Sequence, residues 1–200
     1  LLEGGQCARE ADLTDDEKLA VYDMFLLTMK PTFYVCNIDE DSIASGTNKY
    51  VEVVQKIAAK EKSEVVVICG KFESDLSEIT DANDRKDFME SVELKESGLN
   101  NLARQAYKLM GLRTFFTGGP DDCHAWTIHA GDTAPKAAGV IHTDFEKGFI
   151  KAEVYSINDL KQYGSEAKVK EAGKYRTEGK DYVVQDGDIL FIKFNPPTKK

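Results

Sequence analysis

Two short apolar segments joined by one amphipathic helix constrain the fold of this chain more than any other feature. Thr32–Ile38 and Glu64–Cys69 are rich in β-branched and aromatic residues, and Asn48–Lys60 between them carries its apolar residues on one helical face. Because strands joined through a helix of this length lie parallel, the pattern predicts a βαβ unit. The second strand is almost entirely apolar, which is typical of a sheet covered on both faces. An α/β fold is therefore expected for the first half.

Helices flank this unit on both sides. Residues 13–30 predict one helix, with Thr14 as its N-cap and Pro31 as its stop. Asp84–Val92 and Gly98–Leu112 predict two more. Residues 117–121 read Thr-Gly-Gly-Pro-Asp and predict a loop, beyond which the pattern changes.

The second half alternates short strands with small helices. The expected elements are a strand at Cys123–His129, a helix at Pro135–His142, a strand at Phe149–Tyr155 and a helix over Ile157–Gly173 that breaks at Gly164. Tyr182–Val184 and Ile189–Phe194, joined by Gln-Asp-Gly-Asp, predict a hairpin. We expect an α+β unit over residues 111–194, followed by a loose tail at 195–200.

The charge of the chain is negative and unevenly distributed. The net charge is −9, of which residues 1–114 carry −8 (14 basic, 22 acidic) and residues 115–200 carry −1 (12 basic, 13 acidic). A general nucleic-acid binder carries the opposite excess, so we expect no DNA partner, although the second half can meet RNA locally. Apolar runs reach about five residues against the roughly 20 that span a membrane, so no membrane partner is expected either.

Cysteine and histidine spacings point away from a metal site. The four cysteines form no C-x-x-C pair, which fits a reducing cytoplasmic location, and Cys36 and Cys69 read as small core hydrophobes. His124 and His129 are five apart on one predicted strand and so point to opposite faces. His142 ends a short helix before Thr-Asp, where a capping role is the ordinary reading. We expect no metal ligands in this chain.

The chain has no phosphate-binding loop of the P-loop type. Gly-Lys occurs at 70–71, 173–174 and 179–180, but none of these pairs is followed by Ser or Thr or has the required glycine before it. The motifs G-x-G-x-x-G, G-x-S-x-G and H-E-x-x-H are also absent from the sequence. Because the chain begins at Leu1 rather than Met, we expect a fragment of a longer protein.

The most informative candidate site follows the two predicted parallel strands. Asn37-Ile38-Asp39-Glu40 comes directly after the first strand, and Cys69-Gly70-Lys71 ends the second. Ligands of open α/β sheets bind at the carboxyl ends of strands, so two such loops can hold a base between them. The Asn37 side chain offers an amide and a carbonyl that match adenine N7 and N6. The alternative is that Asn37 is only a turn residue.

The run at residues 37–40 resembles the base-specificity motif of the Obg-like ATPase (YchF) family, in which Asn-x-x-Glu replaces the Asn-Lys-x-Asp of GTPases. Downstream, Phe-Phe-Thr-Gly-Gly-Pro-Asp, Ala-Trp-Thr-Ile, Glu-Ala-Gly-Lys-Tyr-Arg and Val-Gln-Asp-Gly-Asp-Ile-Leu-Phe are similar to the C-terminal TGS domain of that family. The long run His142–Ile150 adds to this likeness, which extends from about residue 13 to 195.

The resemblance implies a fold, an activity and a set of site residues. It implies a partial P-loop nucleotide-binding domain of the Obg type with a parallel sheet, followed by an α+β, β-grasp-like TGS domain. It implies an enzyme that hydrolyses ATP with Mg²⁺, accepts GTP less well and associates with ribosomes. The implied base contacts are Asn37, Ile38, Glu40, Cys69, Gly70 and Lys71. Catalytic and Mg²⁺-binding residues have no positions in this chain, so the chain alone is expected to be inactive.

The same resemblance divides the chain into domains. The expected segments are 1–12 for the end of a helical insertion, 13–90 for the nucleotide-binding domain, 91–110 for a connecting helix, 111–194 for the TGS domain and 195–200 for the tail.

Two rival functions remain open. The first is a non-enzymatic adaptor that binds ribosomes, RNA or protein through the second half, with Lys170, Lys174, Arg176 and Lys180 as candidate RNA contacts. Interleaved glutamates give that cluster an ordinary alternative reading as a solvated helix face. The second rival, a free-standing β-grasp appendage of a tRNA synthetase, is disfavoured by the βαβ unit that precedes it.

Overall fold

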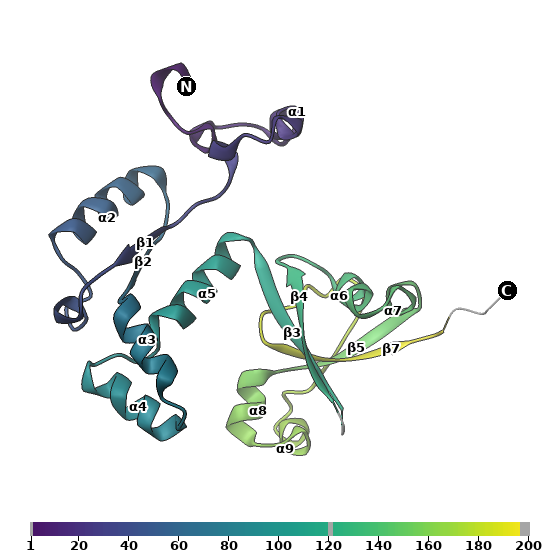
Figure 1. Ribbon diagram of the computed structural model, residues 1–200. Coiled ribbons are helices and arrows are strands. Elements are labelled where there is room, and N and C mark those ends of the chain that lie inside the picture. Colours follow the sequence, from purple (N-terminus) through teal and green to yellow (C-terminus); the bar gives the residue numbers. More distant parts are fainter. Residues whose placement is uncertain (1, 120–121, 197–200) are drawn as a thin grey trace. The chain divides into compact units, whose positions relative to one another are not determined.

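The computed structural model describes residues 2–119 and 122–196, and the chain divides into two compact units, 1–110 and 111–200 (Figure 1). Each unit is described by itself. In the first unit, the helices and strands are η1 (Leu2–Gly4), η2 (Ala8–Glu10), α1 (Asp15–Ala20), η3 (Tyr22–Met24), η4 (Leu27–Met29), β1 (Tyr34–Asn37), η5 (Glu40–Ser42), α2 (Lys49–Glu61), β2 (Val65–Ile68), α3 (Gly70–Glu78), α4 (Ala82–Ser91) and α5 (Gly98–Leu109).

The βαβ prediction is confirmed. Strands β1 and β2 pair in parallel, with Asn37 opposite Ile68, and α2 connects them. Asn48 caps α2 by accepting hydrogen bonds from the amides of Tyr50 and Val51. Lys62, in the left-handed region at φ 55°, ends that helix.

The two faces of this small sheet meet different helices. On one face, Cys36 and Val67 pack against a buried cluster to which α2 and α3 contribute. On the other face lie Val66, which is fully buried, and Ile68, which lies beside Gly98 at the start of α5. Alternation along each strand therefore brings α5 to the face opposite this cluster.

The single helix expected over residues 13–30 is wrong. Thr14 does cap a helix, but α1 ends at Ala20, and two 3-10 turns follow. Phe25 takes φ 47°, a left-handed conformation that an α-helix cannot contain. The apolar residues of this segment remain largely exposed, and helices depend on packing an apolar face for most of their stability.

The second unit is built on one five-stranded sheet in the order β4-β3-β7-β5-β6. Its elements are β3 (Leu112–Gly118), β4 (Cys123–His129), α6 (Ala134–Ile141), α7 (Thr143–Lys147), β5 (Phe149–Ser156), α8 (Ile157–Tyr163), α9 (Glu166–Glu171), β6 (Arg176–Glu178) and β7 (Asp188–Phe194). Strands β3 and β7 are parallel, and the other pairs are antiparallel. The expected α/β unit followed by an α+β unit is therefore confirmed.

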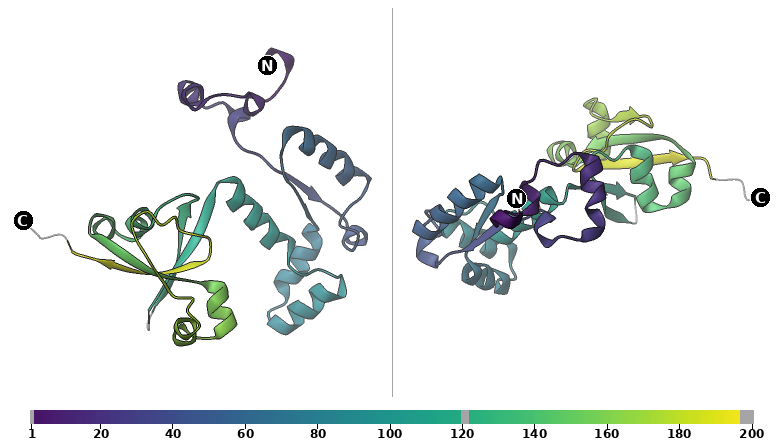
Figure 2. Two further views of the ribbon diagram at one scale, coloured as in Figure 1. Left: turned by 180° about the vertical axis from the view of Figure 1, so that it is seen from behind. Right: turned by 90° about the horizontal axis from the view of Figure 1, so that it is seen from above.

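Helices cover both faces of this sheet. Figures 1 and 2 show α6 and α7 on one side and α8 and α9 on the other. The main core lies under α6, where Phe115, Val154 and Leu190 are essentially inaccessible to solvent. A smaller cluster around Tyr155, Val169 and Ile189 lies under α8 and α9.

Several local predictions for this unit are confirmed. Cys123–His129 is a strand, Gly164 breaks the helical segment at φ 79°, and His142 caps α7 by accepting a hydrogen bond from the Asp144 amide at 3.1 Å. Part of the predicted loop at 117–121 is wrong, because Thr117 and Gly118 end strand β3, while residues 120–121 lie outside the described residues. The same holds for residues 197–200 of the predicted tail.

The hairpin predicted over residues 182–194 is wrong. Residues 182–184 do not pair with β7 but with the segment before α6: the Tyr182 carbonyl accepts from the Ala134 amide, and Val183 bridges Thr133. Strand β7 instead lies between β3 and β5. Tertiary pairing thus overrides the local turn signal, although Gly187 does turn the chain at φ 82°.

Among the described residues, no helix combines the length and apolar character needed to cross a lipid bilayer.

Candidate functional site

The carboxyl ends of β1 and β2 lie next to each other at one edge of the parallel pair. The Ile38 amide donates a hydrogen bond to the Ile68 carbonyl at 2.8 Å, which extends the ladder one residue past β1. The polar residues that follow each strand therefore meet at this edge, as the sequence predicts.

The Asn37 side chain joins the two loops. Its Oδ1 accepts a hydrogen bond from the Gly70 amide at 2.9 Å, across 33 residues of sequence. A Cβ at position 70 would stand 3.3 Å from that oxygen, so glycine is what lets the backbone approach this closely. Asn37 is thus more than a local turn residue, because it holds the start of α3 against the end of β1.

This bond changes what Asn37 can offer a ligand. Since Oδ1 already accepts a hydrogen bond from Gly70, Asn37 cannot use both its carbonyl and its amide to bind adenine in this arrangement. The Asn37 Nδ2 makes no hydrogen bond to any residue in the described ranges, and the residue is solvent-exposed. The site therefore presents one amide donor, which suits a ring-nitrogen acceptor such as adenine N7.

Glu40 and Lys71 make a second link between the segment after β1 and helix α3. The Lys71 Nζ lies 3.5 Å from a Glu40 carboxylate oxygen and 2.8 Å from one of Asp75. The Asp75 hydrogen bond, with smaller help from the charges of Asp75 and Glu40, raises the pKa of Lys71 above its ordinary value. These side chains are more than 40% exposed, so the link positions the loops rather than stabilising the fold strongly.

Ile38 and Cys69 lie beneath this polar layer. Both are buried, at 8% and 6% exposure, in the cluster that includes Phe72 and Leu76. They also line a cavity of about 210 Å³. Their side chains support the loops from below, and base contact by either of them stays a prediction.

The segment after β2 differs from its prediction. The sequence predicts a strand-end loop at Cys69-Gly70-Lys71, and this is wrong, because α3 begins at Gly70 with Cys69 as its N-cap residue. The physical reason is burial: Phe72 and Leu76, four residues apart, lie on one helical face and are both buried.

Glu73 is a residue of this region that the sequence analysis missed. The residue is 7% exposed, and its carboxylate accepts a hydrogen bond from the Gly98 amide at 2.6 Å, which ties α3 to the first turn of α5. Ser97 caps the same helix through the Asn100 amide. The Ser-Gly pair at residues 97–98 indicates the start of α5 in the sequence. No residue near Glu73 indicates that its carboxylate binds the Gly98 amide.

The four candidate RNA contacts of the second unit fall into two kinds. Lys170 pairs with Glu166 at 2.7 Å and lies 4.4 Å from the centre of the Tyr175 ring. Lys174 and Lys180 are exposed, and neither makes an ion pair within the part of the chain that the structure describes.

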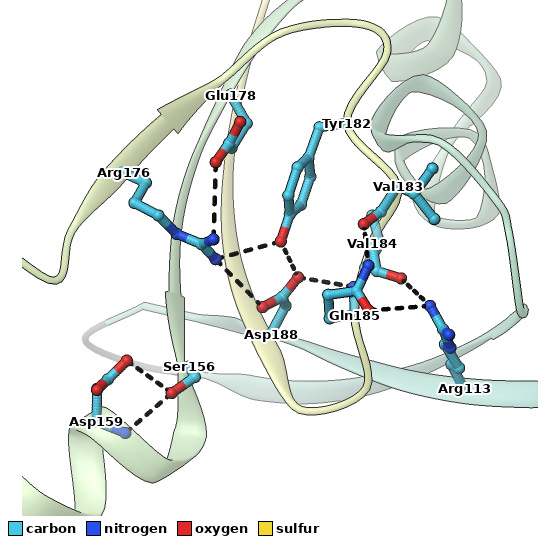
Figure 3. Close-up of polar contacts among 10 residues, drawn as sticks. All are labelled: Arg113, Ser156, Asp159, Arg176, Glu178, Tyr182, Val183, Val184, Gln185 and Asp188. Carbon is cyan, nitrogen blue, oxygen red and sulfur yellow. Dashed lines mark hydrogen bonds and ion pairs between the residues drawn. The ribbon is translucent and has the colours of Figure 1, made fainter.

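Arg176 is committed to an internal network (Figure 3). Its guanidinium lies 3.2 Å from the Tyr182 hydroxyl and 3.8 Å from carboxylate oxygens of Asp188 and Glu178. Asp188, only 2% exposed, also accepts hydrogen bonds from the Tyr182 hydroxyl at 2.7 Å and the Gln185 amide at 2.8 Å. Burial and the Asp188 bond raise the pKa of Tyr182 to about 12.

The described histidines and cysteines do not form a cluster that could bind a metal ion. Within residues 2–119 and 122–196, no three His, Cys, Asp or Glu side chains come together as metal ligands. His124 pairs with Asp122 at 3.1 Å and stacks on Trp126.

A protein-family model matches the second unit. The model YchF-GTPase_C, described as "Protein of unknown function (DUF933)", matches residues 112–195, which is nearly the whole second unit.

Curated relatives match almost the whole chain. It is 47% identical over 195 residues to the ribosome-binding ATPase YchF of Pasteurella multocida, covering 98% of this chain and 53% of that protein. The Bacillus subtilis protein of the same name is 44% identical, covering 94% and 51%. Obg-like ATPase 1 of Xenopus laevis is 42% identical, covering 92% and 47%. The chain spans about half the length of these relatives.

Solved structures agree. A YchF GTPase structure from Schizosaccharomyces pombe matches with a TM-score of 0.80 and 34% identity, covering 96% of this chain and 50% of that one. A GTP-binding protein from Pyrococcus horikoshii matches with a TM-score of 0.59, covering 92% and 51%, but at 18% identity it bears on the fold alone.

Proposed function

Because this chain belongs to the YchF/Obg-like ATPase family, we propose that it is part of an enzyme that binds and hydrolyses ATP, and GTP less well, and that associates with ribosomes in the cytoplasm. Its own contribution is the recognition of the nucleotide base and a separate unit for partner binding. The single observation that carries the first role is the hydrogen bond between Asn37 and Gly70, which builds one site from two strand ends.

The proposed base site has a polar rim and an apolar floor. Asn37 donates from its amide, while Glu40 and Lys71 hold the two loops at the rim. Ile38 and Cys69 form the floor. A guanine reader normally places a short carboxylate where it accepts from N1–H and the exocyclic amine. Glu40, longer than Asp and paired with Lys71, is poorly placed for that contact, which favours adenine.

The domain assignment follows from the same family membership. We propose that residues 13–90 complete the nucleotide-binding domain, that residues 1–12 end a helical insertion and that 91–110 form a connecting segment, of which Gly98–Leu109 is helical. Residues 111–194 are proposed to be the TGS domain, within a unit that is compact by itself.

The phosphates and Mg²⁺ must be held by other parts of the enzyme. The sequence has no P-loop, and the residues that the structure describes form no carboxylate cluster suited to Mg²⁺. The metal would neutralise charge on the transferring phosphoryl group. Because positioning those phosphates is most of the catalysis, residues 1–200 alone are proposed to be inactive.

The test is equilibrium nucleotide binding by the full-length enzyme. Asn37→Ala removes the amide donor and the anchor of Gly70, so ATP affinity is expected to fall by about 1–2 kcal/mol, roughly five- to thirtyfold. Asn100→Ala, an exposed asparagine on α5, is the matched control and should leave affinity unchanged. Equal affinities of both variants and the parent protein would contradict the base site.

A selectivity variant probes the same site differently. Ile38→Lys together with Glu40→Asp is expected to shift preference from ATP toward GTP, because Asp at position 40 accepts from the guanine edge. An unchanged ratio of ATP to GTP affinity would assign residues 38 and 40 to loop structure.

The second candidate function is a ribosome- or RNA-binding adaptor that acts without hydrolysis. The observation that favours it is the exposure of Lys174 and Lys180. Reversing both to Glu should reduce co-sedimentation of residues 111–200 with ribosomes at low salt. Lys170→Glu is the control, since that lysine is already paired with Glu166. Equal pelleting of all three forms would remove this basic cluster from the account.

A further inference from the structure

The two edge strands of the second unit differ sharply. Strand β6 is three residues long and carries two charged residues, Arg176 and Glu178. Short length and charged side chains ordinarily protect an edge strand from pairing with another chain. Strand β4 has seven residues, Cys123–His129, with no Lys, Arg, Pro or Gly, and it pairs with β3 along its whole length without a bulge. Strand β4 therefore lacks the usual protection.

The unused backbone groups of β4 can be identified. The Ala130 amide donates to the Gly111 carbonyl, toward β3, whereas the His129 amide donates to the Asp132 carboxylate, away from β3. Because these directions alternate in an antiparallel pair, the N–H and C=O groups of Ala125 and Thr127 also point away from β3. Within the described ranges, β4 has no neighbouring strand on that side.

The surroundings of this edge define what can occupy it. On the α8 face, β4 presents exposed Ala125 and Thr127, small side chains over which a longer one can reach. Next to them is an open groove of about 720 Å³, with Phe116 and Phe191 among its mostly apolar lining. An added strand with long apolar side chains would place them against that groove.

The charged side chains near β4 further restrict which segment can bind there. Asp122, 74% exposed, stands immediately before β4 beside His124 and has no Lys or Arg partner among the described residues, whereas Asp132, beyond the strand, pairs with Lys136 at 3.5 Å. A second copy of this chain is a poor occupant, because its own β4 contains no Lys or Arg to place near Asp122. A segment with basic residues at its ends complements the negative charge of Asp122 better than a second copy does.

We propose that the outer edge of β4 is a docking site for an extended segment of a partner protein, with alternating long apolar side chains between lysines or arginines. The segment adds as a sixth strand: its backbone pairs with Ala125 and Thr127, its apolar side chains enter the groove, and its basic ends lie near Asp122. Binding at this site requires neither nucleotide hydrolysis nor the exposed lysines Lys174 and Lys180.

The test uses the 200-residue chain and a synthetic peptide of three leucines alternating with threonines, with two lysines at each end. Fluorescence anisotropy measures its affinity, and hydrogen exchange measures protection of individual amides. We expect saturable binding and protection of the Ala125 and Thr127 amides. Binding should weaken at least about tenfold when glutamates replace the four lysines. It should weaken about two- to fivefold when Asp122→Asn is introduced, because a single exposed charge pair contributes little.

Variants of one residue separate backbone pairing from other effects. Ala125→Pro removes an outward N–H that the β3 ladder does not use, so the strand should persist while peptide binding is lost. Ala125→Ser keeps the N–H and should bind normally. If circular dichroism shows that the proline variant is unfolded, Ala125→Lys serves instead, because it keeps the ladder and repels the basic peptide.

Three results would overturn the proposal. The first is no saturable binding, or unchanged binding by the folded proline or lysine variant. The second is self-association that protects Ala125 and Thr127 without peptide, which would assign the edge to a second copy. The third is protection of the same amides by a single-stranded RNA oligonucleotide and not by the peptide.

Discussion

The two units treat their apolar residues in opposite ways. The first, with a two-stranded sheet, leaves large apolar side chains such as Leu19, Phe25 and Leu27 more than 70% exposed. In the second, a five-stranded sheet carries helices on both faces, and few large apolar side chains, Val140 among them, are exposed. A two-stranded sheet offers too little surface to cover its own helices. We therefore expect the second unit to be stable by itself and the first to need further packing.

The largest expected effect comes from separating the units. Residues 111–200 alone should fold and unfold in one cooperative thermal transition, because their core is complete. Residues 1–110 alone should show a broad transition and bind a hydrophobic dye, since their apolar surface is uncovered. Calorimetry and dye fluorescence measure this difference, and a sharp calorimetric transition for residues 1–110 would contradict the comparison.

A core substitution in the second unit should come next in size. Phe115 is completely buried beneath α6, so Phe115→Ala should lower the free energy of unfolding of residues 111–200 by about 3–5 kcal/mol. Urea denaturation of the isolated unit measures it. A loss below about 1 kcal/mol would show that this core is loosely packed.

The polar network in Figure 3 should contribute less. Tyr182→Phe removes one hydrogen bond from buried Asp188 and should cost about 1–3 kcal/mol near neutral pH. The pKa of Tyr182 is raised to about 12 in the folded state, so its neutral form is favoured by folding. That stabilisation is present below about pH 10 and is lost as pH rises toward 12.

Denaturation curves at several pH values check the sign. Stability of the parent unit should fall more steeply between about pH 10 and 12 than that of Tyr182→Phe. Tyr155 and Tyr175 also have raised pKa values, because of burial, so some decline should remain in the variant. If stability falls equally with pH in the parent unit and in Tyr182→Phe, the pKa of Tyr182 is not raised by its burial and its bond to Asp188.

The smallest effect should come from an exposed apolar residue of the first unit. Leu27 is 77% exposed, so Leu27→Ser should change the free energy of unfolding of the 200-residue chain by at most about 0.5 kcal/mol. The same measurement in the full-length enzyme sharpens the comparison. A clearly larger loss there would show that other parts of the enzyme cover this segment.

The sequence predicts those elements whose signal is local. The βαβ unit, the alternation of β4, the cap at His142 and the break at Gly164 all depend on nearby residues, and all are confirmed. Strand β3 was missed because it has apolar residues on both faces, such as Phe115 and Phe116, and so shows no alternation.

Elements decided by distant contacts escape such patterns. The segment at residues 182–184 has a hairpin signal but pairs with residues 132–134. Residues 13–30 have helical spacing, but their apolar side chains stay largely exposed. At the candidate site, the sequence indicates Asn37 and Gly70 as neighbours. It gives no sign that one side chain would bond to the other, or that Glu73 would reach Gly98.

The central claim, that the segment after β1 and the start of α3 hold an adenine base, is tested most directly by photo-crosslinking. The full-length enzyme would be irradiated with 8-azido-ATP, and the labelled peptides identified by mass spectrometry. We predict adducts within residues 37–40 or 69–72, reduced by excess ATP more strongly than by GTP and reduced by Asn37→Ala. Adducts confined to other segments, or equal competition by ATP and GTP, would contradict the account.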